Sequence, residues 1–214
     1  MTQPSSVIFD VGRVLFDWDL RFLYERLIPE DAALDAFLRN VVTTQWHFQH
    51  DAGRPFAETS AELTALYPHH AELIAALGPR FNETNRAMMP GMEALVAELD
   101  AAGVPLYAIT NFSGEFFPPF RAKWAAVFDR FRDVVVSGDE KLMKPDAGIY
   151  HLALDRFGLD AAQAIFVDDN AANVAGAEAV GMHAVLFTGE PRLRADLRRL
   201  GFPLADQKTA ASTL

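Results

Sequence analysis

Four short polar segments of this sequence carry side chains that could do chemistry, and each lies at or just beyond the end of an expected strand. They are Asp10, the pair Thr110-Asn111, Lys144 and the pair Asp168-Asp169. Carboxylates that meet in one place repel one another unless a cation lies between them. Oxygen ligands of this kind suit Mg²⁺, which keeps several waters and shares a phosphate oxygen. Lys144 would balance the remaining charge, and Thr110 could donate a hydrogen bond to a phosphoryl oxygen.

The elements expected around these segments would bring them together at one edge of a sheet. Apolar runs of strand length alternate with helical patterns along much of the chain. We expect strands at 7–9, 104–109, 134–136, 164–167 and 183–187, and helices near 92–99, 116–126, 146–157, 170–180 and 191–200. This alternation predicts an α/β fold, a Rossmann-like three-layer core with a mainly parallel sheet. Ligands of such sheets bind beyond the carboxyl ends of the strands.

The pattern changes between residues 17 and 89, where helical periodicity continues but no buried strand is apparent. We therefore expect an all-helical insertion at 17–89, placed directly after the first strand of a core formed by 1–16 and 90–214. Within it, the segment 46–51 mixes aromatic and polar side chains, a composition suited to gripping a sugar or another small organic body. In the alternative interpretation, Trp46 and Phe48 are core residues and His47 and His50 are surface residues.

Composition excludes several other kinds of protein. The 214 residues carry a formal net charge of −10, which argues against binding to nucleic acid. There is no cysteine, so disulfides, thiolate zinc sites and cysteine nucleophiles are excluded. We find no signal-peptide pattern and no apolar run of about 18 residues, so we expect a cytoplasmic protein without a membrane partner. A monomer and a homodimer both remain open.

The four segments, in this order, resemble the four motifs of the haloacid dehalogenase superfamily. The motifs are matched by Phe9-Asp10-Val11-Gly12-Arg13-Val14-Leu15, by Ile109-Thr110-Asn111, by Lys144-Pro145 and by Phe166-Val167-Asp168-Asp169-Asn170. The resemblance covers roughly residues 5–16 and 90–190. The insertion lies where capped members of this superfamily carry a helical C1 cap.

This resemblance implies a Mg²⁺-dependent hydrolase of small phosphomonoesters, such as sugar phosphates or other phosphorylated metabolites. Asp10 would be the catalytic nucleophile that forms an aspartyl-phosphate, with Lys144 as the second catalytic residue. Asp10, Asp169 and the backbone carbonyl of Gly12 would bind the metal, and Asp168 would lie near it or pair with Lys144. The phosphate would be bound by Val11, Gly12, Thr110, Asn111 and Lys144.

Gly12 is the main departure from the superfamily pattern. Most phosphatases of the superfamily carry a second Asp two positions after the nucleophile, where it acts as general acid and then base. The Asp-x-Gly-x-Val pattern of this chain resembles that of bacterial glucose-1-phosphatases. An enzyme without this acid would favour leaving groups that need little protonation. Alternatively, Asp17, Asp19 or a histidine of the insertion supplies the proton.

Two other functions compete with this interpretation. A 2-haloacid dehalogenase uses the same Asp nucleophile and also lacks the second Asp, but it typically has Tyr where Gly12 stands. Its fourth motif lacks the acidic pair because it needs no metal, so Asp168-Asp169 favours the phosphatase. The third possibility is a catalytically silent binding module, and the presence of Asp10, Lys144 and Asp169 argues against it.

Overall fold

A parallel sheet forms the centre of the protein, which we describe from a computed structural model over residues 3–205. The sheet has the strand order β5-β4-β1-β6-β7, and every neighbouring pair is parallel. The strands are β1 (Ser6–Phe9), β4 (Leu106–Thr110), β5 (Asp133–Val136), β6 (Ala164–Asp168) and β7 (His183–Leu186). The chain ends, 1–2 and 206–214, belong to the expected core segments but lie outside this description.

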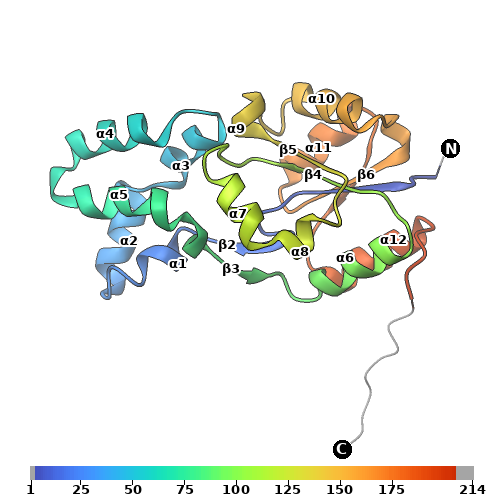
Figure 1. The fold of residues 1–214 in the computed structure, drawn as a ribbon, viewed down its shortest axis with the longest axis horizontal. Helices are drawn as coiled ribbons and strands as arrows, with labels where there is room; N and C mark the ends of the chain where they lie inside the picture. Colours follow the sequence, from blue (N-terminus) through green and yellow to red (C-terminus); the bar gives the residue numbers. More distant parts are fainter. Residues whose placement is uncertain (1–2, 206–214) are drawn as a thin grey trace, which may run out of the picture.

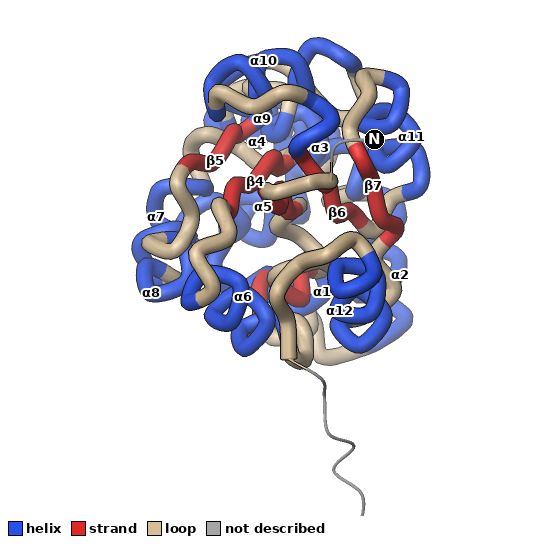
Figure 2. The backbone as a smooth tube through the Cα atoms, turned by 90° about the vertical axis from the view of Figure 1, so that its right-hand side faces the viewer, coloured by secondary structure: helices blue, strands red, loops and turns tan. Residues whose placement is uncertain are grey.

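Helices cover both faces of the sheet (Figure 2). One face carries α6 (Met92–Ala101), α7 (Phe117–Lys123), α8 (Ala125–Phe128) and α12 (Glu190–Arg199). The other face carries α10 (Ala147–Phe157) and α11 (Ala171–Ala179), while α9 (Ser137–Glu140) follows β5 and the short turn η3 (Ala161–Gln163) precedes β6. Side chains of β1 alternate between the two layers, since Val7 and Phe9 belong to the first apolar cluster and Ile8 to the second. The expected three-layer α/β core is confirmed.

The residues between β1 and α6 form a helical cap beside the sheet (Figure 1). Its elements are α1 (Arg21–Tyr24), α2 (Asp31–Asn40), α3 (Thr44–Asp51), α4 (Phe56–Leu66), η1 (Pro68–His70), α5 (Ala71–Arg80) and η2 (Phe81–Thr84). Buried cap residues such as Leu34, Ile74 and Leu77 belong to the same apolar cluster as one layer of the core. Within residues 3–205, no helix has both the length and the apolar character required to span a membrane.

Two short strands join the cap to the core, and the sequence analysis did not expect them. β2 (Phe16–Trp18) pairs antiparallel with β3 (Asn85–Met88), so the two crossings between core and cap lie side by side. The expectation of an insertion without strands is wrong in this respect. Only Phe16 and Asn85 of this ribbon are buried, and the paired residues are 67 and 72 positions apart in sequence (Trp18 with Asn85, and Phe16 with Met88). No continuous apolar run therefore marks the ribbon.

The four polar segments all lie at the carboxyl edge of the sheet. Asp10 follows β1, Thr110 ends β4, and Asp168 ends β6. Lys144 lies in the loop between α9 and α10, beyond the end of β5. Parallel strands bring these positions to one edge although they are up to 159 residues apart, which is the arrangement expected from the sequence.

Candidate active site

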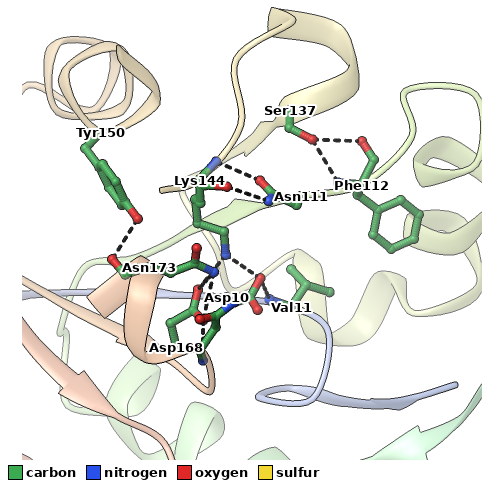
Figure 3. Close-up of polar contacts among 10 residues, drawn as sticks. Asp10, Val11, Asn111, Phe112, Ser137, Lys144, Tyr150, Asp168 and Asn173 are labelled. Carbon is green, nitrogen blue, oxygen red and sulfur yellow. Dashed lines mark hydrogen bonds and ion pairs between the residues drawn. The ribbon is translucent and has the colours of Figure 1, made fainter. Parts of the chain in front are cut away.

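Lys144 lies between two carboxylates at this edge of the sheet (Figure 3). Its Nζ is 2.7 Å from Asp10 Oδ1 and 2.7 Å from Asp168 Oδ2, and all three side chains are buried. Burial by itself lowers the pKa of Lys144, but the two carboxylates outweigh that effect and raise it. Lys144 therefore stays protonated and provides a fixed positive charge beside Asp10.

Asp10 is held from one side only. Its Oδ1 accepts hydrogen bonds from Lys144 and from the backbone N–H of Val11, at 2.7 Å each. No residue among 3–205 donates a hydrogen bond to the other carboxylate oxygen of Asp10, Oδ2. Burial raises the pKa of Asp10 to about 7, with Lys144 opposing the rise, and a cation nearby would favour the charged form. The residue thus offers one carboxylate oxygen to a bound substrate or ion.

Asp168 binds Lys144 and is itself held by two neighbouring residues. Its Oδ1 accepts a hydrogen bond from the backbone N–H of Asn170 at 2.8 Å. The side-chain amide of Asn173 lies 3.1 Å from both carboxylate oxygens and donates to them. Asn173 is itself buried, so its amide fixes the carboxylate of Asp168 beside Lys144. Of the two roles expected for Asp168, the geometry favours the partner of Lys144.

Asn111 also acts on Lys144, through the backbone. Its Oδ1 accepts a hydrogen bond from Lys144 N at 2.9 Å, and its Nδ2 donates to Lys144 O at 3.0 Å. Asn111 lines the pocket in front of Asp10, whereas Thr110 and Val11 are buried and are not among its lining residues. The expected contacts of Thr110 and Val11 with phosphate remain predictions.

Three carboxylates are close enough to share a cation. Asp10, Asp168 and Asp169 each offer one oxygen, and these oxygens lie within 4.8 Å of one another. Burial and the charge of Asp168 raise the pKa of Asp169, with Arg13 opposing them, so a cation here would relieve an unfavourable charge. The donors are all oxygen, and Gly12 lines the same pocket. The residues therefore fit Mg²⁺, with Asp10 and Asp169 better placed than Asp168, which is already engaged.

A pocket of about 170 Å³ opens in front of Asp10, between the core and the cap. Aromatic side chains line part of the pocket. Its polar and charged lining residues are Asp10, Arg13, Thr44, Asp51, Asn85, Asn111, Lys144, Asp169, Asn170 and Asn173. The ring of His47 stacks between Trp18, at 5.4 Å, and Phe81, at 5.6 Å. The aromatic wall is formed by Trp18, His47, Phe48, Phe81 and Phe112.

Some residues of the cap segment 46–51 fit the interpretation of substrate contact, and others fit the interpretation of core packing. His47, Phe48 and Asp51 line the pocket, as expected of a segment that contacts the organic body of a substrate. Trp46 is buried in the cap, where its Nε1 donates to the carbonyl of Thr59. His50 is fully buried, with Nε2 2.7 Å from Thr59 Oγ1, so it is neither a surface residue nor a lining residue.

Asp51 is a pocket residue to which the sequence assigned no role beyond its place in the segment 46–51. It ends α3, is only 4 % exposed, and lines the pocket together with Asp10. Its Oδ1 is buried without a hydrogen-bond partner, and Nε2 of His47 lies 3.7 Å from it. Burial and the charge of Asp10 raise the pKa of Asp51 to about 7, against the opposing effects of the Ser113 backbone N–H and Lys144.

The two acids that the sequence suggested as proton donors are elsewhere. Neither Asp17 nor Asp19 lines the pocket. Asp19 instead accepts a hydrogen bond from the backbone N–H of Arg21 at 2.8 Å, at the start of α1. Two positions after Asp10, Gly12 leaves open space, because a Cβ atom built there would meet no atom within 4 Å.

The parallel sheet, the helical cap and the lysine held between two aspartates define a capped protein with a Rossmann-like α/β core. A haloacid dehalogenase-like hydrolase model matches residues 7–181, so the chain belongs to this family. The resemblance of its four motifs to this family is therefore confirmed.

Relatives of the chain include both phosphatases and a dehalogenase. It is 28 % identical over 205 residues to the sesquiterpene phosphatase astK of Aspergillus oryzae, covering 93 % of this chain and 97 % of the relative. It is 28 % identical over 176 residues to hexitol phosphatase A of Escherichia coli, covering 82 % and 74 %. It is 30 % identical over 124 residues to (S)-2-haloacid dehalogenase 4A of Burkholderia cepacia, covering 56 % of this chain and about half, 53 %, of that enzyme.

Solved structures show the same fold. One is a haloacid dehalogenase family enzyme of Bacteroides thetaiotaomicron in complex with magnesium and inorganic phosphate. The two chains superpose with a TM-score of 0.65 at 18 % identity, over 87 % of this chain and 95 % of the other.

Proposed function

We propose that this protein is a Mg²⁺-dependent phosphatase of small phosphomonoesters that works through an aspartyl-phosphate on Asp10. The observation that carries the proposal is the pair of contacts of Lys144, 2.7 Å from Asp10 and 2.7 Å from Asp168, beside the further carboxylate of Asp169. This arrangement concentrates positive charge and metal ligands around one carboxylate that faces a pocket. Such surroundings suit the binding of a phosphoryl group.

The residues of the site have distinct tasks in this mechanism. Asp10 presents Oδ2 to the phosphorus, while its Oδ1 is fixed by Lys144 and Val11. The ammonium of Lys144 offsets negative charge on the phosphoryl oxygens, and Asn111 fixes the backbone that carries it. Asp10, Asp169 and the carbonyl of Gly12 would hold Mg²⁺, which when bound supplies the charge that lets a phosphate dianion approach a carboxylate.

The pocket supports a substrate whose organic part has an apolar face. Five ring side chains form its wall, while Asn85 and Thr44 add polar groups to the same pocket. Sugars and isoprenoid chains can both lie against such a wall, and two relatives are named for a sesquiterpene and for hexitols. We therefore include both classes, as phosphorylated metabolites, among the candidate substrates.

A panel of phosphomonoesters tests this function. Sugar phosphates, alkyl and prenyl phosphates and aryl phosphates are incubated with the protein and Mg²⁺, and released phosphate is measured. We expect release that depends on Mg²⁺ and is absent in Asp10→Asn, in which the amide is a poor nucleophile. Absence of phosphate release across the panel would contradict the proposal.

Dehalogenation of 2-haloacids is the second candidate, and the similarity to (S)-2-haloacid dehalogenase 4A favours it. The carboxylate cluster of Asp10, Asp168 and Asp169 weighs against it, because a dehalogenase of this family needs no metal. Including 2-haloacids in the same panel and measuring halide separates the two functions. Halide release without Mg²⁺ and without phosphatase activity would support the dehalogenase.

A further inference from the structure

Phosphomonoester hydrolysis needs a proton donor for the leaving oxygen, and Gly12 has no side chain to provide one. A carboxyl group of the cap lies in the same pocket. Asp51, at the end of α3, lines this pocket together with Asp10. A substrate bound with its phosphoryl group at Asp10 would extend its leaving group toward the cap.

The position of Asp51 is fixed to the core of the protein, not only to the cap. Its backbone carbonyl accepts a hydrogen bond from Ser137 Oγ at 2.6 Å, and Phe112 N donates to the same hydroxyl at 3.0 Å. Close by, a Cβ atom on Gly53 would lie 2.8 Å from the carbonyl oxygen of Gly138, so the two backbones are in direct contact. Ser137 and Gly138 begin α9, which directly follows β5 of the core sheet. Contacts with the core therefore determine the position of Asp51.

The surroundings of Asp51 favour the carboxyl form with its proton. Thr59 Oγ1 lies 3.3 Å and 3.2 Å from the carbonyls of Pro55 and Phe56 and donates its proton to them, so it accepts from His50 Nε2. His50 Nδ1 then accepts from His47 Nδ1 at 3.4 Å, which leaves His47 Nε2 as a lone pair. This lone pair faces Asp51 Oδ1 at 3.7 Å, where a carboxylate would be repelled and an O–H would not.

We propose that Asp51 is the catalytic acid and base of this enzyme, in place of the aspartate that is missing at position 12. The inference rests on the proposed phosphatase function. It assigns the proton transfer to the cap and the nucleophilic attack to the core.

Each step then balances. Asp10 Oδ2 attacks phosphorus, the bond from phosphorus to the leaving oxygen breaks, and that oxygen takes the carboxyl proton of Asp51 and departs as an alcohol. Asp51, now a carboxylate, takes a proton from a water molecule whose oxygen attacks the phosphorus of the aspartyl-phosphate. The bond from phosphorus to Asp10 breaks, inorganic phosphate leaves, and both residues return to their starting forms.

The other ionisable groups near the pocket do not suit this role. Burial lowers the pKa of His47 to about 3 and that of His50 to about 4, so both rings are neutral at neutral pH. Lys144 is held between two carboxylates and keeps its proton. Asp51 is the remaining acid that combines burial, an unpartnered oxygen and access to the pocket within residues 3–205.

Leaving-group dependence tests the assignment. The rate of the first chemical step is measured by rapid quench for wild type, Asp51→Asn and Asp17→Asn, on aryl and alkyl phosphates of graded leaving-group pKa. Asp17→Asn makes the same chemical change at a half-buried acid outside the pocket. We expect a shallow dependence for wild type and Asp17→Asn. Asp51→Asn should lose about 10²- to 10⁴-fold on alkyl phosphates and little on p-nitrophenyl phosphate, whose leaving group needs no proton.

The outcomes separate this inference from the function it rests on. A retained burst of p-nitrophenol from p-nitrophenyl phosphate, which reports the first chemical step alone, shows that Asp51→Asn is folded. Asp51→Ala, which places no amide in the buried position, provides a second variant with the same expected result. Equal rate losses on aryl and alkyl substrates, or no loss on either, would overturn the role of Asp51 and leave the phosphatase function intact. Failure of wild type to hydrolyse any phosphomonoester would overturn both.

Discussion

Asn111 holds the backbone of Lys144 with two reciprocal hydrogen bonds, accepting from its N–H at 2.9 Å and donating to its carbonyl at 3.0 Å. The two residues belong to different motifs and are 33 positions apart. This amide therefore connects the end of β4 to the loop before α10. The position of the lysine ammonium, and through it the orientation of Asp10, depends on the Asn111 side chain. Asn111 can therefore affect the reaction without contacting the substrate.

Replacing Asn111 should lower the rate more than it weakens substrate binding. Asn111→Ala leaves the N–H and carbonyl of Lys144 without these partners, which costs about 1–3 kcal/mol of stability, and frees the lysine to move. Asn111→Asp keeps an acceptor for the N–H but places a second oxygen against the carbonyl. We expect a larger fall in kcat than rise in KM for both variants. Asn40→Ala, on the exposed end of α2, is the control, and equal kinetics for control and variants would contradict the role.

The stability of the metal-free protein should report the buried state of Asp51. Burial raises its pKa from 3.8 to about 7, so between these values the folded protein binds a proton that the unfolded chain does not. The protonated carboxyl of Asp51 therefore contributes to the stability of the folded state. This contribution is complete below about pH 4 and is lost as the pH rises to about 7. Because Asp51→Asn lacks it, the variant should gain stability relative to wild type over that range. Urea unfolding with chelator present measures the difference, and a pH-independent difference would contradict the buried carboxyl.

Mg²⁺ should stabilise the protein through Asp169. A ligand at 100 times its Kd raises the free energy of unfolding by about 2.7 kcal/mol, so wild type should show a rising Tm as Mg²⁺ is added, and chelation should abolish turnover. Asp169→Asn should require a higher Mg²⁺ concentration for the same shift. Asp155→Asn, an exposed acid on α10, should behave as wild type. A Tm of wild type that does not respond to Mg²⁺ would count against the metal site.

The open space at Gly12 allows the missing acid to be restored. A side chain there would meet no atom within 4 Å of its Cβ position, and Gly12 does not have the positive φ that disfavours other residues. In the Asp51→Asn background, Gly12→Asp should raise the rate on alkyl phosphates by about 10²-fold, the lower end of the range for a positioned acid. The measurement is the same rapid-quench series. An unchanged alkyl rate would indicate that a carboxyl group at position 12 cannot reach the leaving oxygen.

Sequence patterns were sufficient for the central strands of the core because β1, β4 and β6 are buried along their whole length. Runs such as Val7-Ile8-Phe9 have no polar residue to obscure them, and these three strands end at or beside the candidate site residues Asp10, Thr110 and Asp168. The ribbon of β2 and β3 escaped prediction because it is three to four residues long, largely half-exposed, and held by pairing between distant segments.

The site divides in the same way. Asp10, Lys144 and Asp169 follow strands or occur in ordered motifs, so their meeting could be inferred. Asp51 ends a helix of the cap among aromatic residues, and no spacing relates it to Asp10. Its place in the pocket depends on the contact of Ser137 with its backbone, which is a tertiary feature. Because Gly12 cannot act as an acid, the acidic residues of the cap were candidates for that role, and Asp51 is one of them.

The central claim, that Asp10 is the nucleophile of a phosphatase, is tested most directly by trapping its phosphorylated form. The protein is mixed with Mg²⁺ and a hydrolysed phosphomonoester, quenched in acid during turnover, digested and analysed by mass spectrometry. We predict one added phosphoryl group on the peptide that contains Asp10, and none in Asp10→Asn. Steady phosphate release with no phosphoryl group on that peptide, or with Asp10→Asn as active as wild type, would contradict the account.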